Sequence, residues 1–307
     1  MGVCLRVLVL GGNGFIGSHV VDHLVAAGHK VRVFDRSVEL YREPLKHVEY
    51  RFGRFDDTFQ VAEALDGMDA VCHLISSTVP GTSNLDPVVD VESNLVNTLK
   101  LLEQMRKKNL HRILYLSSGG AVYGNTVTSP IGEDQPLNPI SSYGVVKVSI
   151  EKYLLMYQQL YGFKPIILRP SNPYGPRQGH VGVQGLIGTF LARILAGERL
   201  EIWGDGSVVR DYMHVSDLSR LCVSALESET CGVFNAGSGE GNSINQIVDL
   251  IRNLADEELQ IDYRQGRACD VQEVVLDISK AIEAFNWSPE VSLSDGILNH
   301  LEWLRDQ

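Results

Sequence analysis

The sequence predicts an α/β protein built around a doubly wound parallel sheet. Short apolar runs of strand length alternate with longer stretches of helical spacing through the first half of the chain. A glycine turn, Gly11-Gly-Asn-Gly-Phe-Ile-Gly17, joins the first apolar run directly to the first helical stretch. Strands that alternate with helices in this way pair in parallel, and the helices cover both faces of the resulting sheet.

The elements of this first half follow one another through short connections. We expect strands at residues 5–10, 30–34, 48–51, 70–73, 111–117 and 164–168. We expect helices at residues 18–27, 58–65, 87–107 and 143–161. Several of the strands are apolar at nearly every position, as strands are when helices bury both faces of their sheet. Glycine and serine residues gather at the carboxyl ends of the strands, where a ligand crevice is therefore expected.

The pattern of elements changes after residue 168. A turn-rich stretch at 169–176 is expected to leave the sheet, and residues 204–206 are expected to form a hairpin-like turn after a short strand at 200–203. One more strand is expected at 233–235, with helices at 182–196, 216–226, 243–256, 279–285 and 293–305. We predict one domain from residues 1–168 with late elements near 207–236, and a smaller interleaved α/β domain from residues 169–206 and 237–307.

Bulk composition narrows the possible functions. The 307 residues include 27 Lys and Arg against 38 Asp and Glu, and the net charge of −11 argues against a nucleic-acid or anionic-membrane partner. The five cysteines are scattered without a Cys-x-x-Cys pair, so neither a disulfide framework nor a metal site is expected. The first strand begins within a few residues of Met1, and no apolar run reaches the length of a membrane span. A cytoplasmic protein is expected.

The glycine turn has the context that a dinucleotide site requires. It follows a strand, opens a helix, and precedes a second strand that ends in an acid, Asp35. Glycines let backbone N–H groups approach a pyrophosphate, and the helix N-terminus adds favourable partial charge. Asp35 is placed to accept hydrogen bonds from a ribose diol, and its carboxylate would repel a 2′-phosphate. NAD is therefore favoured over NADP, and the neighbouring Arg36 weakens that preference.

A second motif, Tyr143-Gly-Val-Val-Lys147, lies at the start of an expected helix. Residues four apart share one helix face, so the phenol and the ammonium lie one turn apart. A phenol has a reference pKa of about 10 and is a poor base at neutral pH. A neighbouring ammonium favours the phenolate, so this pair could shuttle a proton. An exposed tyrosine beside a solvated lysine would give the same short pattern, so the motif gains weight only from its surroundings.

Five motifs in order resemble the extended short-chain dehydrogenases/reductases, and within them the nucleotide-sugar epimerase/dehydratase branch. Besides the two motifs above, they are Ser117-Ser-Gly-Gly-Ala-Val-Tyr-Gly124, Arg169-Pro-Ser-Asn-Pro-Tyr-Gly175 and Trp203-Gly-Asp-Gly-Ser-Val-Val-Arg-Asp-Tyr-Met-His-Val-Ser-Asp217. The resemblance covers the chain essentially from end to end. It implies a Rossmann-like sheet that binds NAD and a smaller α/β domain that binds a nucleotide-diphosphate sugar.

The resemblance also implies roles for individual residues, with Tyr143 and Lys147 as the catalytic pair. The residues expected at the cofactor are Gly11, Gly14, Phe15, Ile16, Gly17, Asp35, Arg36, Phe55, Leu74, Ser76, Asn94, Ser117, Tyr143 and Lys147. The residues expected at the substrate are Asn172, Gly185, Leu186, Trp203, Arg210, Arg267 and Asp270. Two arginines at a diphosphate make chemical sense, since the guanidinium fork matches phosphate oxygens.

The chain departs from the family pattern beside the tyrosine. The family usually has a Ser or Thr at the position of Gly119, whose hydroxyl binds the sugar 4-oxygen. Ser117, Ser118 or a water molecule could supply that hydroxyl, and Ser118 is our preferred catalytic replacement. Family dehydratases carry Thr-Asp-Glu here, whereas residues 119–121 are Gly-Gly-Ala and lack the acids that eliminate water.

Two further positions bear on the ligands. The family often has Gly-Asp at the adenine contact, where this chain has Gly53-Arg54, so only the backbone contact by Phe55 carries over. The position that gates substrate size in some hexose epimerases is Val274, and its small side chain permits an N-acetyl sugar.

The favoured function is an NAD-dependent UDP-hexose 4-epimerase that works through a transient 4-keto sugar. Its substrate would be UDP-glucose/galactose or the N-acetyl or uronic forms. The alternatives are a nucleotide-sugar dehydratase, a reductase that consumes NAD(P)H, and a non-catalytic dinucleotide-binding protein. The resemblance also implies a homodimer in which helices 87–107 and 143–161 of two copies form a four-helix bundle.

Overall fold

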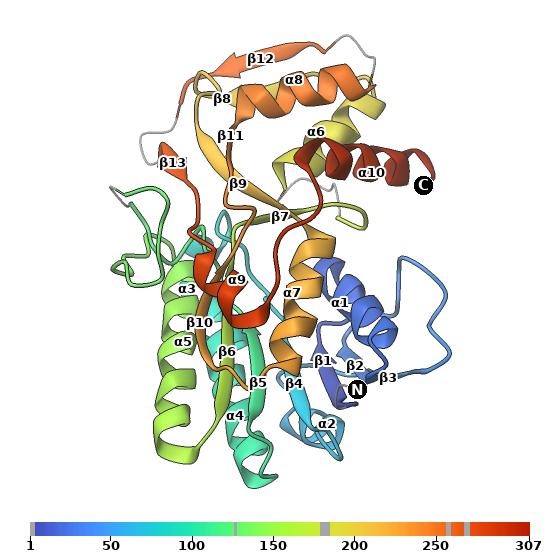
Figure 1. The fold of residues 1–307 in the computed structure, drawn as a ribbon, viewed down its shortest axis with the longest axis vertical. Helices are drawn as coiled ribbons and strands as arrows, with labels where there is room; N and C mark the ends of the chain where they lie inside the picture. Colours follow the sequence, from blue (N-terminus) through green and yellow to red (C-terminus); the bar gives the residue numbers. More distant parts are fainter. Residues whose placement is uncertain (1–3, 126–127, 179–184, 256–258, 267–270) are drawn as a thin grey trace.

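The computed structural model describes residues 4–125, 128–178, 185–255, 259–266 and 271–307. Within these residues, seven parallel strands form a central sheet in the order β10-β6-β5-β4-β1-β2-β3 (Figure 1). The strands are β1 (Arg6–Leu10), β2 (Lys30–Asp35), β3 (Val48–Phe52), β4 (Ala70–His73), β5 (Arg112–Leu116), β6 (Lys164–Pro170) and β10 (Gly232–Ala236). The predicted doubly wound sheet is confirmed. Its strand order reverses between β1 and β4, which places a crevice at the carboxyl ends of these two strands.

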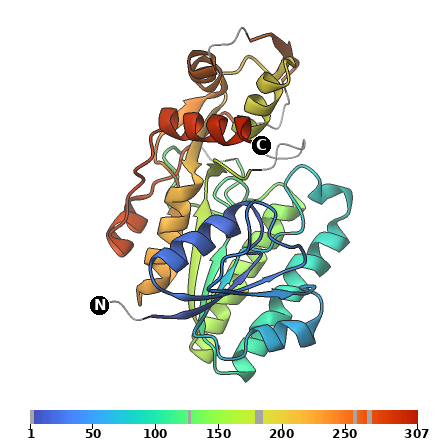
Figure 2. The same ribbon diagram turned by 90° about the vertical axis from the view of Figure 1, so that its right-hand side faces the viewer.

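The two faces of the sheet have separate cores because successive side chains of a strand point to opposite faces. Val7 and Val9 of β1 pack with α1 (Phe15–Ala26) and α7 (Val215–Glu227). Leu8 and Leu10 pack with helices on the other face, namely α2 (Thr58–Ala64), α4 (Asn97–Lys107) and α5 (Ser142–Tyr161). Figure 2 shows the sheet between these two layers of helices. All four of these β1 side chains are fully buried, which explains the unbroken apolar run.

The predicted helix at 87–107 is present but is not uniform. It begins as α3 (Pro87–Asp90), passes through a π-helical segment at Val91–Val96, and continues as α4. Pro87 stands in the first turn, where its missing N–H costs no hydrogen bond, and the Asp86 carboxylate accepts from Val89 N at 3.0 Å. A π-helical segment inside an α-helix often accompanies a functional site.

Most of the remaining elements lie beyond the carboxyl ends of the sheet strands, whereas α9 (Ser279–Phe285) packs beside β10 and α7 (Figure 1). A four-stranded sheet contains β7 (Asn172–Tyr174), β9 (Val209–His214), β11 (Gly241–Ser243) and β13 (Glu273–Val274), and β8 (Leu200–Trp203) pairs with β12 (Ile261–Arg264). The accompanying helices are α6 (Leu186–Leu195), α8 (Ile244–Ala255), α9 (Ser279–Phe285) and α10 (Leu293–Arg305). Helices α6, α8 and α10 share a third apolar core with β7, β8 and β9.

One prediction for this part was wrong in part, and another was wrong. The stretch 169–176 leaves the central sheet after Pro170, but it is not turns throughout, because β7 forms within it and pairs in parallel with β9. Residues 204–206 do not form a hairpin turn, because β8 pairs with β12 whereas β9 pairs with β7, β11 and β13. Strands of two to four residues carry too little periodicity to be recognised. The stretch with Gly204 and Gly206 connects β8 in one sheet to β9 in another.

No helix in the described ranges is long and apolar enough to cross a membrane. In the same ranges no group of three or more His, Cys, Asp or Glu residues is arranged to hold a metal ion. Cys4, Cys72, Cys222 and Cys231 are present as free thiols.

Candidate active site

The glycine turn after β1 is held by contacts that exclude larger residues. Gly11 has a left-handed backbone with φ of 84°, and its N–H donates to Phe34 O at 2.9 Å. A Cβ atom on Gly17 would lie 2.0 Å from the Gly11 carbonyl oxygen, so α1 reaches the turn only because residue 17 has no side chain. Gly14 is the N-cap of α1, and no side chain there caps the helix. The partial positive charge of this helix N-terminus therefore suits an anion.

Asp35 lies at the end of β2 beside the turn. Its carboxylate accepts from Asn13 N at 3.1 Å and from Ser37 N at 3.0 Å. Both oxygens retain accepting capacity, since an ionised carboxylate offers about four lone-pair sites. Arg36 is exposed. The turn and Asp35 thus fit the pyrophosphate and the ribose diol of a dinucleotide.

The loop after β4 forms the next wall of the crevice. Leu74 N donates to Leu10 O at 3.0 Å, which holds this loop against the glycine turn, and Ser76 follows it with an exposed side chain. The Phe55 ring packs on His73, with ring centroids 5.1 Å apart. Arg54, which replaces the usual acid of the family, is paired with Asp56 at 2.7 Å. The cofactor residues expected after β1, β2 and β4 are therefore brought to one edge of the sheet.

Asn94 lies in the π-helical segment and faces the same loop. Its side-chain oxygen accepts from Ser77 N at 2.9 Å, and its amide nitrogen donates to Thr78 Oγ1 at 3.1 Å. The residue is buried. Its carboxamide thus fixes the loop that follows Ser76.

Tyr143 and Lys147 come together in the first turns of α5, as predicted. Lys147 Nζ lies 5.4 Å from the centroid of the Tyr143 ring and 4.8 Å from that of the Tyr115 ring. It donates to Leu116 O at 2.7 Å at the end of β5. Burial lowers the pKa of Lys147 to about 8, and the charge of Glu151 opposes this shift. The ammonium is thereby fixed at the carboxyl end of the sheet.

Tyr143 is flanked by two serine side chains. Burial raises the pKa of Tyr143 to about 12, while hydrogen bonding with Ser118 and Ser76 lowers it. In this state the phenol keeps its proton at neutral pH. A catalytic phenolate would need additional positive charge beside it.

The structure distinguishes the two serines considered for the missing hydroxyl. Ser117 donates its hydroxyl to the buried Glu151 and its N–H to Leu168 O. Ser118 interacts with Tyr143 instead. Of the two, Ser118 is the one that stays our candidate replacement, because the Ser117 hydroxyl is already bonded to Glu151.

A side chain at Gly119 would meet close neighbours on two sides. A Cβ atom here would lie 2.5 Å from Leu276 Cδ1 and 3.0 Å from the carbonyl oxygens of Arg169 and Pro170. The Gly119 N–H donates to Pro170 O at 2.7 Å, so the backbone is held in this position. A Ser or Thr at this position would force Leu276 or the backbone to move.

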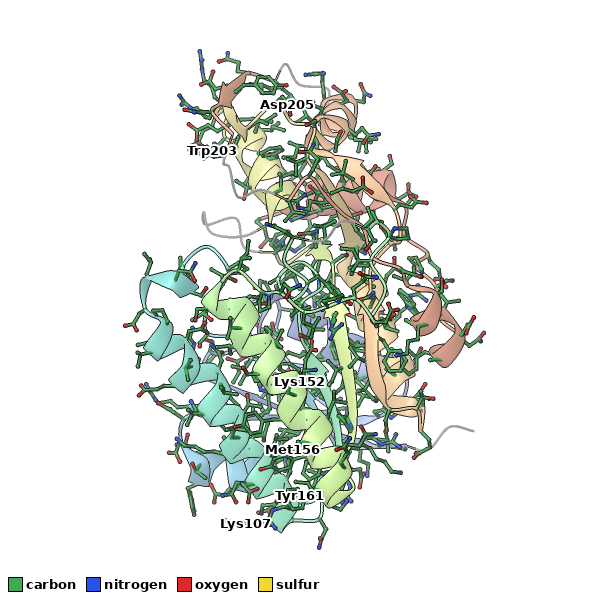
Figure 3. All side chains as sticks on the ribbon, turned by 90° about the vertical axis from the view of Figure 1, so that its left-hand side faces the viewer. Lys107, Lys152, Met156, Tyr161, Trp203 and Asp205 are labelled. Atoms are coloured by element: carbon green, nitrogen blue, oxygen red, sulfur yellow. The ribbon has the colours of Figure 1, made fainter. Side chains whose placement is uncertain are left out.

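On the substrate side, the described residues lie along β7, β8, β9 and α6. Asn172 donates to Asp211 O at 2.8 Å, and Arg210 donates to Val209 O at 2.8 Å. Val274 is buried and stands opposite Arg210 in the pairing of β13 with β9. Trp203 is 45% exposed at the end of β8 (Figure 3).

Two of the other substrate residues follow a gap in the described chain, and two lie inside another gap. Gly185, with φ of 93°, is the N-cap of α6, and Leu186 is the first residue of that helix. Arg267 and Asp270 lie outside the described residues. Their predicted convergence with Arg210 therefore stays a prediction.

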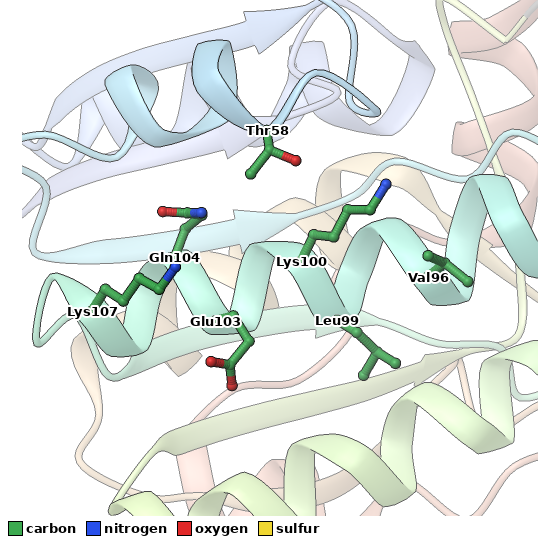
Figure 4. A pocket seen from close by; sticks show the side chains of 7 residues that line it. All are labelled: Thr58, Val96, Leu99, Lys100, Glu103, Gln104 and Lys107. Carbon is green, nitrogen blue, oxygen red and sulfur yellow. The ribbon is translucent and has the colours of Figure 1, made fainter.

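A separate hollow of about 360 Å³ lies between α2 and α4, and Tyr143 is not among the residues that line it (Figure 4). It is lined by Thr58, Val96, Leu99, Lys100, Glu103, Gln104 and Lys107. None of these is a predicted site residue. The crevice at the strand ends, and not this hollow, is the candidate site.

Two residues that shape the site were missed from the sequence. Asp90 is fully buried near Tyr143, yet in a helical pattern it looks like an ordinary surface charge. Leu276 fills the space beside Gly119, but it lies far along the chain, and nothing local indicates the contact. The sequence pattern predicts an ordinary α-helix at 91–96, and it carries no signal for the π-helical segment found there.

Comparison with known proteins places these features in context. The model of the NAD dependent epimerase/dehydratase family matches residues 7–237. A UDP-glucose 4-epimerase of Mycolicibacterium smegmatis is 34% identical, over 99% of each chain. The solved UDP-glucose 4-epimerase of Thermotoga maritima, with UDP-glucose, has a TM-score of 0.92 and 35% identity over 98% of this chain and 99% of that chain. The Thermus thermophilus enzyme, in complex with NAD, has a TM-score of 0.91 and 34% identity over the same shares.

Proposed function

Because the chain belongs to the NAD dependent epimerase/dehydratase family, we propose that it inverts C4 of a UDP-hexose with NAD as bound cofactor. UDP-glucose 4-epimerases similar to it from end to end support the reaction and the nucleotide. The observation that carries the proposal is the Tyr143–Lys147 pair, with Ser118 beside it, at the same sheet edge as the glycine turn.

The cofactor would lie across the carboxyl ends of β1 and β4. Backbone N–H groups of the turn around Gly14 would bind the pyrophosphate, and Asp35 the adenosine ribose. Leu74 and Ser76 would line the middle of the dinucleotide, and Lys147 would hold the nicotinamide ribose. When bound there, the cofactor would supply reversible hydride chemistry at C4 of the sugar, without net consumption.

The chain's own groups would move the proton. The Tyr143 phenolate would take the proton of the sugar 4-hydroxyl, and Ser118 would hold the 4-oxygen by a hydrogen bond. The Lys147 ammonium would stabilise the phenolate in a site from which water is largely excluded. Inversion then requires the keto sugar to present its other face before Tyr143 returns the proton.

The nucleotide would occupy the second part of the molecule, which we propose as the substrate domain of residues 169–206 and 237–307. Trp203 would pack on the base, and Asn172, Arg210 and Arg267 would hold the diphosphate. Gly185 and Leu186 would line this cleft, and Asp270 would reach the nucleotide ribose. The small side chain of Val274 permits an N-acetyl group at C2.

The competing reactions can be separated in one set of assays. Purified protein would be incubated with UDP-glucose, UDP-galactose and their N-acetyl and uronic forms, and the products would be identified by NMR. We expect a C4-inverted sugar with no change of absorbance at 340 nm. Net NAD(P)H consumption would instead indicate a reductase, and a keto-deoxy sugar a dehydratase. Absence of any C4-inverted product would refute the proposal.

We also propose a cytoplasmic homodimer, held by α3, α4 and α5 of two copies. Apolar side chains on α3 and α5 are exposed, including Val88, Val89, Val145, Met156 and Leu160. Met156 and Tyr161 lie on the outward side of α5 in Figure 3. A face of this kind would be buried in a dimer.

The dimer can be tested by sedimentation. Met156→Glu combined with Leu160→Glu should give a monomer, because two charges would be placed in the contact. Leu195→Glu is the control, since Leu195 is 42% exposed on α6. Equal masses for both variants and the parent chain would contradict this interface.

A further inference from the structure

A fully buried carboxylate, Asp90, lies at the end of α3. Its Oδ1 accepts from Thr78 Oγ1 at 2.6 Å and from Asn94 Nδ2 at 2.9 Å. Its Oδ2 accepts from Ser142 Oγ at 2.7 Å. All three partners donate to it, as they would to an ionised carboxylate, and together they offset the loss of water around a charge.

The three donors come from three different segments. Thr78 belongs to the loop after β4, which follows Ser76. Asn94 belongs to the π-helical segment and holds Ser77 of the same loop. Ser142 is the first residue of α5 and directly precedes Tyr143. Asp90 therefore joins the loop on the cofactor side of the crevice to the turn that carries the tyrosine.

Other contacts between the same segments show that this turn is docked by its neighbours. Tyr143 N donates to Ser83 Oγ at 3.1 Å, and Ser142 N donates to Asn84 Oδ1 at 2.8 Å. These two amides belong to the first turn of α5, where no intrahelical acceptor exists for them. The chain between β4 and α4 thus supplies the acceptors that fix the height and rotation of Tyr143.

Asp90 also acts electrostatically on both proposed catalytic groups. Its charge opposes ionisation of Tyr143 and favours the ammonium form of Lys147. The other groups that face the pair are the Glu151 carboxylate from α5, the Tyr115 phenol from β5, the His73 imidazole from β4, and the Ser76 and Ser118 hydroxyls. Burial lowers the pKa of His73 to about 3, so its ring is uncharged at neutral pH. Asp90 differs from these groups because its carboxylate accepts a hydrogen bond from Ser142, the residue directly before Tyr143.

We propose that Asp90 is a positioning residue for the catalytic tyrosine: its carboxylate ties the first turn of α5 to the loop after β4 and keeps a negative charge beside the phenol and the ammonium. The proposal rests on the proposed function only in taking Tyr143 as catalytic. The hydrogen bond from Ser142 to Asp90 fixes the position of the Tyr143 phenol relative to the substrate. The charge retains the proton on Lys147.

Asp90→Asn removes the charge and keeps the shape. The titration of Lys147 would be followed by NMR of carbon-labelled lysine in the NAD-loaded protein and in the protein without NAD. The Lys147 signal would be assigned by its loss in Lys147→Met. We expect the midpoint in Asp90→Asn to fall by about half a pH unit or more. The pH profile of kcat should move to lower pH in the same variant, because both groups lose the influence of the negative charge.

Asp217→Asn is the matched control. Asp217 is equally buried and accepts from Arg220 and from the N–H groups of Glu290 and Val291, none of which contacts Tyr143 or Lys147 in the described structure. We expect this variant to lower Tm without moving the Lys147 midpoint. If Asp90→Asn behaves in the same way, Asp90 is a structural residue and the proposal fails.

Ser142→Ala tests the tie and keeps the charge. We expect the Lys147 midpoint to stay in place while kcat falls about tenfold with little change in KM, because one hydrogen bond to a charged group is lost. An unchanged kcat would overturn the positioning role, and this holds even if Asp90→Asn does not fold. The NMR titration needs no turnover, so failure of the epimerase assay and failure of this proposal give different results.

Discussion

The cofactor side and the tyrosine side of the crevice are held by different kinds of contact. On the cofactor side, the decisive contacts involve backbone atoms: Gly17 lies against the Gly11 carbonyl, and Gly11 donates to Phe34 O. On the tyrosine side, side chains make the decisive contacts: Lys147 lies over Tyr115, and Ser118 interacts with Tyr143. A backbone site tolerates almost no substitution at its glycines, whereas a side-chain site can exchange one donor for another.

The position of Gly119 illustrates this difference. Leu276 Cδ1 fills the place of the Cβ atom that the family usually has there, and the neighbouring Ser118 interacts with Tyr143 instead. Ser118, one residue earlier in the chain than Gly119, is the hydroxyl that we propose in place of the usual one. Nothing equivalent is possible at Gly17, where any Cβ atom meets a backbone oxygen.

The largest effect is expected from Tyr143→Phe, which removes one oxygen from the side-chain half. General acid–base catalysis is worth about 10²–10⁴-fold, and kcat should fall by that factor. NAD binding and Tm should change little. Tyr161→Phe is the control, because Tyr161 is 42% exposed at the far end of α5. Steady-state kinetics of both variants measure the difference, and near-normal turnover by Tyr143→Phe would remove the phenol from the mechanism.

Gly17→Ala tests the backbone half. Its Cβ atom would lie 2.0 Å from the Gly11 oxygen, so the turn or α1 must shift, at a cost of about 1–3 kcal/mol or more. We expect a lower Tm and NAD affinity reduced by about tenfold or more, measured by calorimetry. Gly81→Ala is the matched change, since a Cβ atom at Gly81 meets nothing within 4 Å. Equal NAD affinity in the two variants would show that the turn does not hold the cofactor.

Ser118→Ala and Ser117→Ala separate a catalytic from a structural hydroxyl. A hydrogen bond to a charged group contributes about 1.5–3 kcal/mol, so Ser118→Ala should lower kcat by about 10–100-fold at nearly constant Tm. Ser117→Ala should lower Tm instead, because it leaves Glu151 without one of its donors. The opposite pattern in kinetics and thermal unfolding would identify Ser117 as the replacement.

The smallest effect concerns the pH dependence of stability. The pKa of Lys147 is about 8 in the folded protein, because burial lowers it from 10.5. Between these two values the unfolded chain binds a proton that the folded chain has lost, so the free energy of unfolding should rise with pH. The rise should be on the order of 1 kcal/mol or more. Denaturant unfolding at pH 8 and pH 10 measures it, and Lys147→Met should remove it. An equal rise in that variant would assign the effect to other groups.

Much of the cofactor half could be predicted from the sequence because it depends on local pattern. The run before Gly11 is a strand buried on both faces, and the glycine spacing permits only a tight turn into a helix. The four-residue spacing of Tyr143 and Lys147 predicts that they share one helix face, and the 5.4 Å between Lys147 Nζ and the Tyr143 ring centroid confirms this. These features need no knowledge of distant segments.

The unpredicted features depend on contacts between distant segments. Leu276 reaches Gly119 from far along the chain, and Asp90 accepts a hydrogen bond from Ser142, which lies 52 residues further along the chain. β7 has only three residues and pairs with β9, which also pairs with β11 and β13 from later in the chain. Local propensity carries no signal for such contacts, because tertiary packing determines them.

The most direct test of the proposed chemistry follows the hydrogen at C4. UDP-glucose and UDP-N-acetylglucosamine, each carrying deuterium at C4, would be incubated with the NAD-loaded protein in ordinary water. A hydride that leaves C4 and returns within one site predicts a C4-inverted sugar that retains deuterium, with no net change at 340 nm. An inverted product in which solvent hydrogen has replaced deuterium, or no inverted product from either substrate, would contradict the account.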